Sequence, residues 1–246
     1  MVPAGIGHSL EGLHAVSAAL RAGRLTHLLV ERSRLDHPQV APLVEECRRL
    51  RLDVEVVADL GPLTTTTAPQ GVAALARPIE TVGLEEVVSA TQPAALAVLD
   101  HLEDAHNVGA IARSAAAAGL GGLVVPTRRA APLGPTAFKA ASGALEHLPV
   151  AMVSSTAEAL RALQKLGLWL VGLVADGDRS LFGLELLSEP VALVVGAEGR
   201  GLGRLVEERL DVRARIPMVE PVESLNASVA AGLAAFEVAR VRGRVE

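Results

Sequence analysis

From about residue 95 onward, short apolar segments alternate with helical patterns, and this alternation constrains the fold more than any other feature of the chain. An apolar segment without a polar face predicts a strand that is covered on both sides, and strands separated by helices are typical of a mostly parallel sheet. We therefore expect an α/β fold. The predicted strands are 96–100, 123–126, 150–153, 168–174, 191–196 and 212–216, and the clearest helical patterns span 108–118 and 157–166.

The first 76 residues resemble a smaller α/β unit of their own. Helical spacing runs from Leu10 to Leu20, and a second helical pattern over 40–50 lies between strand-like segments at 27–31 and 54–57. From 77 to 94 the periodicity is lost and Pro, Gly, Thr and Ser become frequent, which indicates a linker. The predicted domains are 1–76, a linker 77–94, and 95–246.

Composition excludes several classes of protein. The only cysteine is Cys47, so an internal disulfide and a cysteine-based zinc cluster are excluded. The longest apolar run, around 115–125, falls short of the roughly 20 residues that a membrane helix needs. The formal net charge of −5 argues against a general nucleic-acid binder, although nearly all the positive charge is arginine, the better phosphate ligand. We expect a soluble cytoplasmic protein that holds no metal and contacts no membrane.

Three segments that follow predicted strands carry unusual polar residues. The first runs over 99–109 into a helix, and its residues Asn107 and Arg113 are expected at the helix cap and in its second turn. Function in parallel α/β sheets lies at the carboxyl ends of the strands. Taken alone, however, this segment is also typical of a capped helix that carries a surface arginine.

The second segment, 194–203, is a strand that runs into four glycines, at 196, 199, 201 and 203. Such a turn can bring backbone groups close to a ligand. The G-x-G-x-x-G register of dinucleotide sites is absent, and no Gly-Lys-Ser/Thr follows. Glu198 lies inside the turn, where a carboxylate would repel a phosphate. The segment therefore suits a ligand with positive charge or hydroxyl donors, or else a plain tight turn.

The third segment, 216–230, leaves a strand at Ile216, passes through a proline-rich loop and enters a long helix of small residues. Ser224 is expected to cap this helix, with Asn226 exposed in its first turn. Polar residues at such a position often serve only as caps.

Together the three segments resemble the TrmH-type (SpoU) branch of the SPOUT methyltransferases. The shared motifs, in order, are N-x-G-x-x-x-R-S-A from Asn107, G-A-E-G-x-G from Gly196, and I-P-M from Ile216 followed by S-L-N-x-S-V-A from Ser224. The segment K-A-A-S-G-A-L-E-H at 139–147 also looks like that family. The N-terminal 75 residues are similar to the family's ribosomal-protein-L30e-like RNA-binding module, so the resemblance covers essentially the whole chain.

The resemblance implies a SPOUT domain with a mostly parallel sheet and a deep trefoil knot, a homodimer, and S-adenosylmethionine as the methyl donor. Its catalytic and substrate-contacting positions correspond to Asn107, Arg113, Glu198, Ser224 and Asn226. Its donor-binding positions correspond to Gly196, Ala197, Gly199, Ile216, Met218 and Leu225. Two residues depart from the family pattern: Glu220 stands near a usual glycine, and Ala105 replaces the proline before the His-Asn pair.

The resemblance is closest to the enzymes that methylate the ribose 2′-hydroxyl of a guanosine in 23S rRNA. We expect RNA as the partner, either 23S rRNA or a large-subunit precursor, and we expect Arg113 to bind a phosphate and orient the hydroxyl. A guanidinium has a pKa above about 12, so its use as a base needs strong perturbation. A tRNA ribose methyltransferase, a drug-resistance rRNA methyltransferase and a non-catalytic RNA-binding relative remain alternatives. A nicotinamide-dependent oxidoreductase is disfavoured, because this chain lacks the glycine register that such an enzyme needs.

Overall fold

The structure is a computed structural model that describes residues 5–66, 69–221 and 224–245. The chain forms two compact units, Met1–Glu80 with Pro132–His147, and Thr81–Ala131 with Leu148–Glu246. None of the helices in the described ranges is long and apolar enough to cross a membrane.

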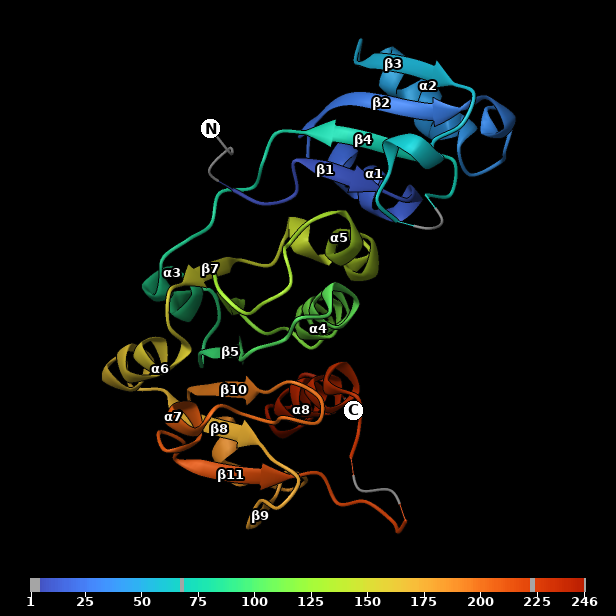
Figure 1. Ribbon diagram of the computed structural model, residues 1–246. Coiled ribbons are helices and arrows are strands. Elements are labelled where there is room, and N and C mark those ends of the chain that lie inside the picture. Colours follow the sequence, from blue (N-terminus) through green and yellow to red (C-terminus); the bar gives the residue numbers. More distant parts are fainter. Residues whose placement is uncertain (1–4, 67–68, 222–223, 246) are drawn as a thin grey trace. The chain divides into compact units, whose positions relative to one another are not determined.

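The first unit is built on a four-stranded sheet with the order β1-β4-β2-β3 (Figure 1). Strand β4 is antiparallel to both of its neighbours, and β2 is parallel to β3. The apolar side chains of the sheet and its helices form a core that includes Leu10, Val16, Leu28 and Cys47. The elements of this unit are β1 (Ser9–Glu11), α1 (Leu13–Arg21), β2 (Leu25–Glu31), α2 (Ala41–Arg49), β3 (Asp53–Val57), β4 (Val72–Ala76) and α5 (Pro135–Ala141).

Helix α5 belongs to this first unit, whereas the sequence places its residues in the C-terminal domain. The helix packs against β1 and α1, and its residue Phe138 is fully buried against Gly7, where an added Cβ would lie 2.3 Å from the ring. Further along the same segment, Glu146 forms an ion pair of 2.6 Å with Arg24, and both side chains are almost completely buried. Burial of a large ring and pairing of a buried charge hold 132–147 in this unit.

The second unit is a seven-stranded sheet with the order β7-β6-β5-β10-β8-β11-β9, and all its strand pairs are parallel. Strands β5, β6 and β10 are buried along their whole length, as expected of a sheet covered on both faces. The strands are β5 (Ala95–Leu99), β6 (Leu123–Pro126), β7 (Val150–Val153), β8 (Trp169–Leu173), β9 (Arg179–Ser180), β10 (Val191–Val195) and β11 (Val212–Arg215).

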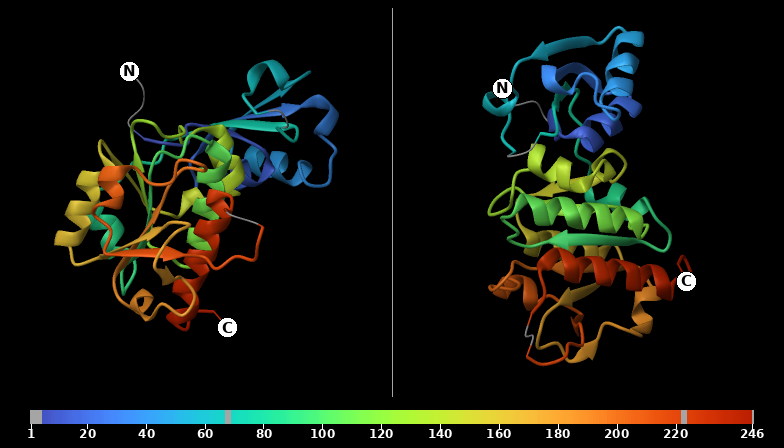
Figure 2. Two further views of the ribbon diagram at one scale, coloured as in Figure 1. Left: turned by 60° about the horizontal axis from the view of Figure 1, so that its bottom comes forward. Right: turned by 90° about the vertical axis from the view of Figure 1, so that its right-hand side faces the viewer.

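Helices cover both faces of this sheet. The left view of Figure 2 shows α6 and α7 on one side of the strands and α4 and α8 on the other. Helices α4 and α8 contact each other extensively, and α3 packs against α6. The helices of this unit are α3 (Leu84–Ser89), α4 (Ala105–Ala117), α6 (Thr156–Lys165), α7 (Arg204–Glu207) and α8 (Ala227–Val241).

The strand order places a switch point between β5 and β10. From β5 the chain moves to β6 and β7 on one side, and the later strands β8, β10 and β11 lie on the other. The two loops that leave β5 and β10 therefore diverge, and ligands bind in the opening that such a divergence leaves at the carboxyl ends of the strands. The first two polar segments singled out in the sequence follow β5 and β10.

Three local expectations differ from the structure. Asp104, and not Asn107, caps α4: its Oδ1 accepts a hydrogen bond of 2.9 Å from the backbone N–H of His106. Asn226, and not Ser224, caps α8 through its Oδ1. In both helices the side chain that reaches the free N–H groups lies at a position that residue type alone does not identify. The expected linker contains α3, whose Val87 is buried in the core of the second unit.

Candidate active site

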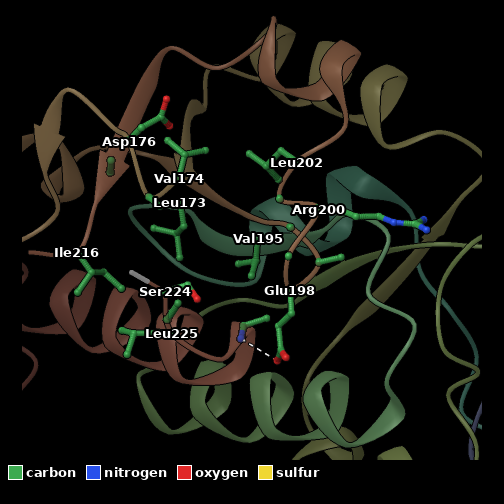
Figure 3. Close-up of a pocket in the computed structure, with 18 of the residues that line it drawn as sticks. Leu173, Val174, Asp176, Val195, Glu198, Arg200, Leu202, Ile216, Ser224 and Leu225 are labelled. Atoms are coloured by element: carbon green, nitrogen blue, oxygen red, sulfur yellow. Dashed lines mark hydrogen bonds between the residues drawn. The ribbon is translucent and has the colours of Figure 1, made fainter. Parts of the chain in front are cut away.

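A cavity of about 450 Å³ lies at the carboxyl ends of β10, β8 and β11, beside the start of α8. Figure 3 shows Leu173, Val195, Ile216 and Leu225 among the apolar side chains that line it. Polar groups come from the turn after β10, from Ser224, and from a charged group on β11 with its two partners. A mostly apolar cavity with a few convergent polar groups is typical of a small-molecule site.

The glycine turn after β10 folds back on itself so tightly that Gly196 can carry no side chain. A Cβ at Gly196 would lie 2.4 Å from the backbone carbon of Gly201 and 2.5 Å from its oxygen. The backbone groups of Ala197 and Gly201 exchange two hydrogen bonds of 3.2 and 2.9 Å, and Gly199 and Gly201 both adopt positive φ. The turn therefore presents backbone, rather than side chains, to this part of the cavity.

Asn107, Glu198 and Asn226, which are far apart in the sequence, form one hydrogen-bonded cluster. Glu198 Oε1 accepts a bond of 3.0 Å from Asn107 Nδ2, a bond from Asn226 Nδ2, and a bond of 3.2 Å from the backbone N–H of Ala227. Asn226 Nδ2 also donates to Asn107 Oδ1 at 3.0 Å. The cluster joins α4, the glycine turn and the start of α8.

This cluster is held firmly and still reaches solvent. Asn226 Oδ1 accepts from the backbone N–H groups of Ser228 and Val229, at 2.9 and 3.3 Å, so its amide orientation is fixed by the cap of α8. Asn107 is buried, whereas Glu198 and Asn226 are exposed. Polar groups that are fixed by their neighbours and remain accessible can position a substrate with little reorganisation.

A second cavity of about 690 Å³ lies at the ends of β6, β5 and β10. It shares Ala197, Glu198, Arg200, Gly201 and Leu202 with the first cavity, so the glycine turn borders both. Its other lining residues are His101, Leu102, Glu103, Asp104, Asn107, Arg129 and Gly203. Two ligands held in these cavities would meet at the turn that carries Glu198.

The structure brings together most of the residues expected from the sequence. Gly196, Ala197, Glu198, Gly199, Ile216, Met218, Ser224 and Leu225 line the first cavity. Asn107 lines the second cavity, and Asn226 joins both through its hydrogen bonds. Arg113 is different: it is exposed on α4 and lines neither cavity.

Sequence reasoning missed a charged group on the wall of the first cavity. Arg213 on β11 lies 2.7 Å from Asp176 and 3.0 Å from Glu207, and all three residues line the cavity. The hydrogen bond from Arg213 holds the pKa of Asp176 below its usual range. The sequence offered one signal for this group: Asp176 follows the carboxyl end of a predicted strand. Within the described ranges, no cluster of three or more His, Cys, Asp or Glu residues could hold a metal ion.

Comparison with known proteins identifies RNA methyltransferase families in both parts of the chain. Residues 94–236 match the SpoU rRNA methylase family, and residues 9–82 match the RNA 2′-O ribose methyltransferase substrate-binding family. The chain is 39% identical to the 23S rRNA (guanosine-2′-O-)-methyltransferase RlmB of Xanthomonas campestris, over 94% of this chain and 95% of that protein. It is 38% identical to the putative TrmH family tRNA/rRNA methyltransferase YacO of Bacillus subtilis, over 95% and 96%.

Solved structures that are similar to this chain include enzymes of the same group. The SpoU methyltransferase AviRb from Streptomyces viridochromogenes, in complex with the cofactor AdoMet, is 26% identical, with a TM-score of 0.78 over 97% of this chain and 91% of that one. The A. aeolicus TrmH/SpoU tRNA modifying enzyme is 25% identical, with a TM-score of 0.55 over 65% of this chain and 81% of that one. Two matched domains and full-length relatives above 30% identity show that the chain belongs to the SpoU (TrmH-type) family of RNA 2′-O-ribose methyltransferases.

Proposed function

We propose that this enzyme transfers the methyl group of S-adenosylmethionine to the ribose 2′-hydroxyl of a guanosine in 23S rRNA, in the cytoplasm. The observation that carries the proposal is the pair of cavities that meet at the Asn107–Glu198–Asn226 cluster. A methyl transfer needs a donor and an acceptor side by side, and this arrangement offers a place for each.

The first cavity fits the methyl donor. Gly196 leaves backbone exposed where a Cβ would fill the cradle, and the apolar side chains of Leu173, Ile216 and Leu225 can pack against the faces of an adenine ring. The carboxylate of Glu198 on the same wall suits a ligand that carries a positive charge. When bound, the donor supplies an electrophilic methyl group on a sulfonium.

The chain's own residues then have to hold the ribose and orient its hydroxyl. Asn226 uses both of its N–H groups and its oxygen within the cluster, so it fixes Asn107 and Glu198. One N–H of Asn107 and the Oε2 of Glu198 are not used by these bonds and can form hydrogen bonds to a sugar. Because positioning alone can contribute a large part of the rate acceleration, an arrangement of amides without a strong base is compatible with the reaction. Arg113, exposed on α4, is proposed to bind a phosphate of the substrate RNA.

An exchange of Arg113 tests that role. In Arg113→Lys the charge remains while the planar fork is lost, so we expect the rate of methyl transfer to fall about tenfold or more. The measurement is kcat across a range of pH. Full kcat at every pH would contradict both the phosphate role and a role as base.

The substrate class rests on the first unit. The A. aeolicus tRNA modifying enzyme matches 65% of this chain, whereas the full-length match RlmB acts on 23S rRNA. Residues 9–82 match a substrate-binding family, and such a module can select a large folded RNA. The tRNA alternative is an outcome of the test below.

We also propose a homodimer, formed through α8, and the trefoil knot that the family resemblance implies. Val229, Leu233 and Phe236 lie at i, i+4 and i+7 on α8 and are 50%, 38% and 43% exposed. A stripe with this spacing lies on one face of a helix and favours burial against a partner. Analytical ultracentrifugation at micromolar concentration tests the dimer, and a monomer there would contradict it.

The decisive experiment is transfer of tritiated methyl from S-adenosylmethionine to total RNA that lacks this modification. The RNA is separated into ribosomal and transfer fractions and digested to nucleosides. Label in 2′-O-methylguanosine from large-subunit RNA supports the proposal. Label in transfer RNA would keep the reaction and overturn the substrate. Intact donor binding without label in any RNA would indicate a non-catalytic RNA-binding protein.

A further inference from the structure

The second cavity carries two arginines that have no role in holding the fold. Arg129 and Arg200 are both exposed, and neither forms a hydrogen bond or an ion pair with a residue that the structure describes. Of the three carboxylates that line this cavity, Glu103 is also exposed and has no such bond within the described residues, whereas the other two differ in this respect. Asp104 caps α4, and Glu198 accepts hydrogen bonds from Asn107 and Asn226.

The two arginines come from loops on either side of β5. Arg129 follows β6, and Arg200 lies in the turn after β10, while β5 lies between those strands in the sheet. Figure 3 shows the guanidinium of Arg200 directed away from Leu173, Val174 and Ile216 of the first cavity. The cavity between these loops therefore has a cationic group at each of two borders.

Hydrogen bonds fix the loops that carry these groups. The backbone N–H of Asp100 donates to Val195 at 2.8 Å, and the backbone N–H of Ala131 donates to Leu102 at 2.8 Å. Asp100 Oδ2 accepts from the backbone N–H of Gly203 at 2.8 Å, and this carboxylate is almost completely buried. The loops after β5, β6 and β10 are thus tied together, so the cavity is formed before a ligand arrives.

We propose that the second cavity holds the acceptor nucleotide and that Arg129 and Arg200 bind the RNA phosphates on its two sides. This inference rests on the proposed function and assigns its acceptor site. An arginine fork matches the geometry of a phosphate, and two such groups across one cavity suit the backbone on both sides of a single extruded nucleotide. The reacting ribose then lies beside Asn107 and Glu198, where the two cavities meet.

The test compares Arg129→Gln, Arg200→Gln and the double variant with Arg161→Gln as a matched control. Arg161 is an exposed arginine on α6 that lines neither cavity. The substrate is deproteinised large-subunit rRNA from cells that lack the modification. We expect each cavity variant to raise the KM for RNA about tenfold, because one hydrogen-bonded phosphate contact is lost, and to lower kcat less than it raises KM.

Salt dependence separates a phosphate contact from a structural effect. In filter binding of the same rRNA, each cavity variant should reduce the slope of log affinity against log salt by about 0.7 to 1. The variant Arg200→Lys keeps the charge, so it should retain the slope while KM still rises. Arg129 lines only the second cavity, so the affinity of Arg129→Gln for S-adenosylmethionine should match that of Arg161→Gln, and the melting temperature of every variant should match that of this control.

Unchanged KM and unchanged salt slope in the double variant, with the wild type active, would overturn this inference and leave the proposed function intact. If the wild type methylates no RNA, the proposed function fails. The salt slope of RNA binding does not depend on turnover, so in that case it still decides whether these two arginines contact phosphate.

Discussion

Two carboxylates, one in each unit, accept hydrogen bonds from three donor groups and yet have different surroundings. In the first unit, Glu11 accepts from the backbone N–H and hydroxyl of Thr65, at 2.7 and 3.0 Å, and from the backbone N–H of Thr66, at 2.8 Å. Its side chain is buried. In the second unit, Glu198 accepts from Asn107, Asn226 and Ala227, and it is exposed between two cavities.

The difference teaches that hydrogen-bond number does not distinguish a structural carboxylate from a functional one. A buried carboxylate whose donors are lost costs stability, because the charge stays away from water. An exposed carboxylate can be solvated, so loss of its donors costs little stability and instead frees the groups that it positioned. Whether a carboxylate reaches a cavity therefore decides whether it controls stability or the positioning of catalytic groups. Four changes can test this difference between the two units.

The largest expected effect follows from Gly196→Ala. The added Cβ would overlap the backbone of Gly201, so the turn between the cavities has to open. We expect the affinity for S-adenosylmethionine to fall more than about 100-fold, as measured by titration calorimetry. Gly134→Ala in the first unit is the control, since an added Cβ there meets nothing within 4 Å. Equal effects of the two variants would contradict the close approach at Gly196.

Glu198→Gln should have the next largest effect, and this effect should appear in the rate of catalysis. All three donors of the cluster bind Oε1, and the neutral amide oxygen that would replace it accepts these hydrogen bonds more weakly, so Asn107 and Asn226 are held less firmly. Because small misplacements can cost about 100-fold in rate, we expect a loss of that order in single-turnover methyl transfer. The melting temperature should change little. A large drop in melting temperature with normal turnover would reverse the assignment of Glu198.

Glu11→Gln should instead lower stability and leave the rate of methyl transfer nearly unchanged. Loss of charge-assisted bonds to Thr65 and Thr66 should lower the free energy of unfolding by about 2 kcal/mol. Burial raises the pKa of the Cys47 thiol to about 11, so its reaction with a disulfide reagent reports opening of the first unit. Labelling of Cys47 should be faster in Glu11→Gln than in Glu45→Gln, an exposed control in the same unit. Equal labelling rates would refute the structural role.

The smallest expected effect is that the contribution of Glu11 to stability depends on pH. Burial raises the pKa of Glu11, but the hydrogen bonds from Thr65 and Thr66 outweigh it and place the pKa below its ordinary value. The stabilisation is therefore complete above the pKa of the unfolded chain, about 4.3, and is lost as pH falls through the folded pKa. In urea titrations, the stability difference between wild type and Glu11→Gln should narrow on acidification. A difference independent of pH would exclude ionisation as its source.

Much of the second unit could be predicted from local pattern. Strands 123–126 and 150–153 agree with the structure residue for residue, because a short apolar run between turn residues has few alternatives to a buried strand. The helix caps were less predictable. Asp104 and Asn107 are both good cap residues, and only the backbone path shows which of them reaches a free N–H group.

What the sequence by itself determined was the α/β class, the polar loops at the carboxyl ends of strands, and the motifs that mark the family. Those properties depend on side-chain type and spacing along a few residues. Only the tertiary structure decided that Asn107, Glu198 and Asn226 form one cluster, that 132–147 belongs to the first unit, and that Arg113 lines neither cavity. The physical reason is that strand order, which no local pattern encodes, determines which loops meet.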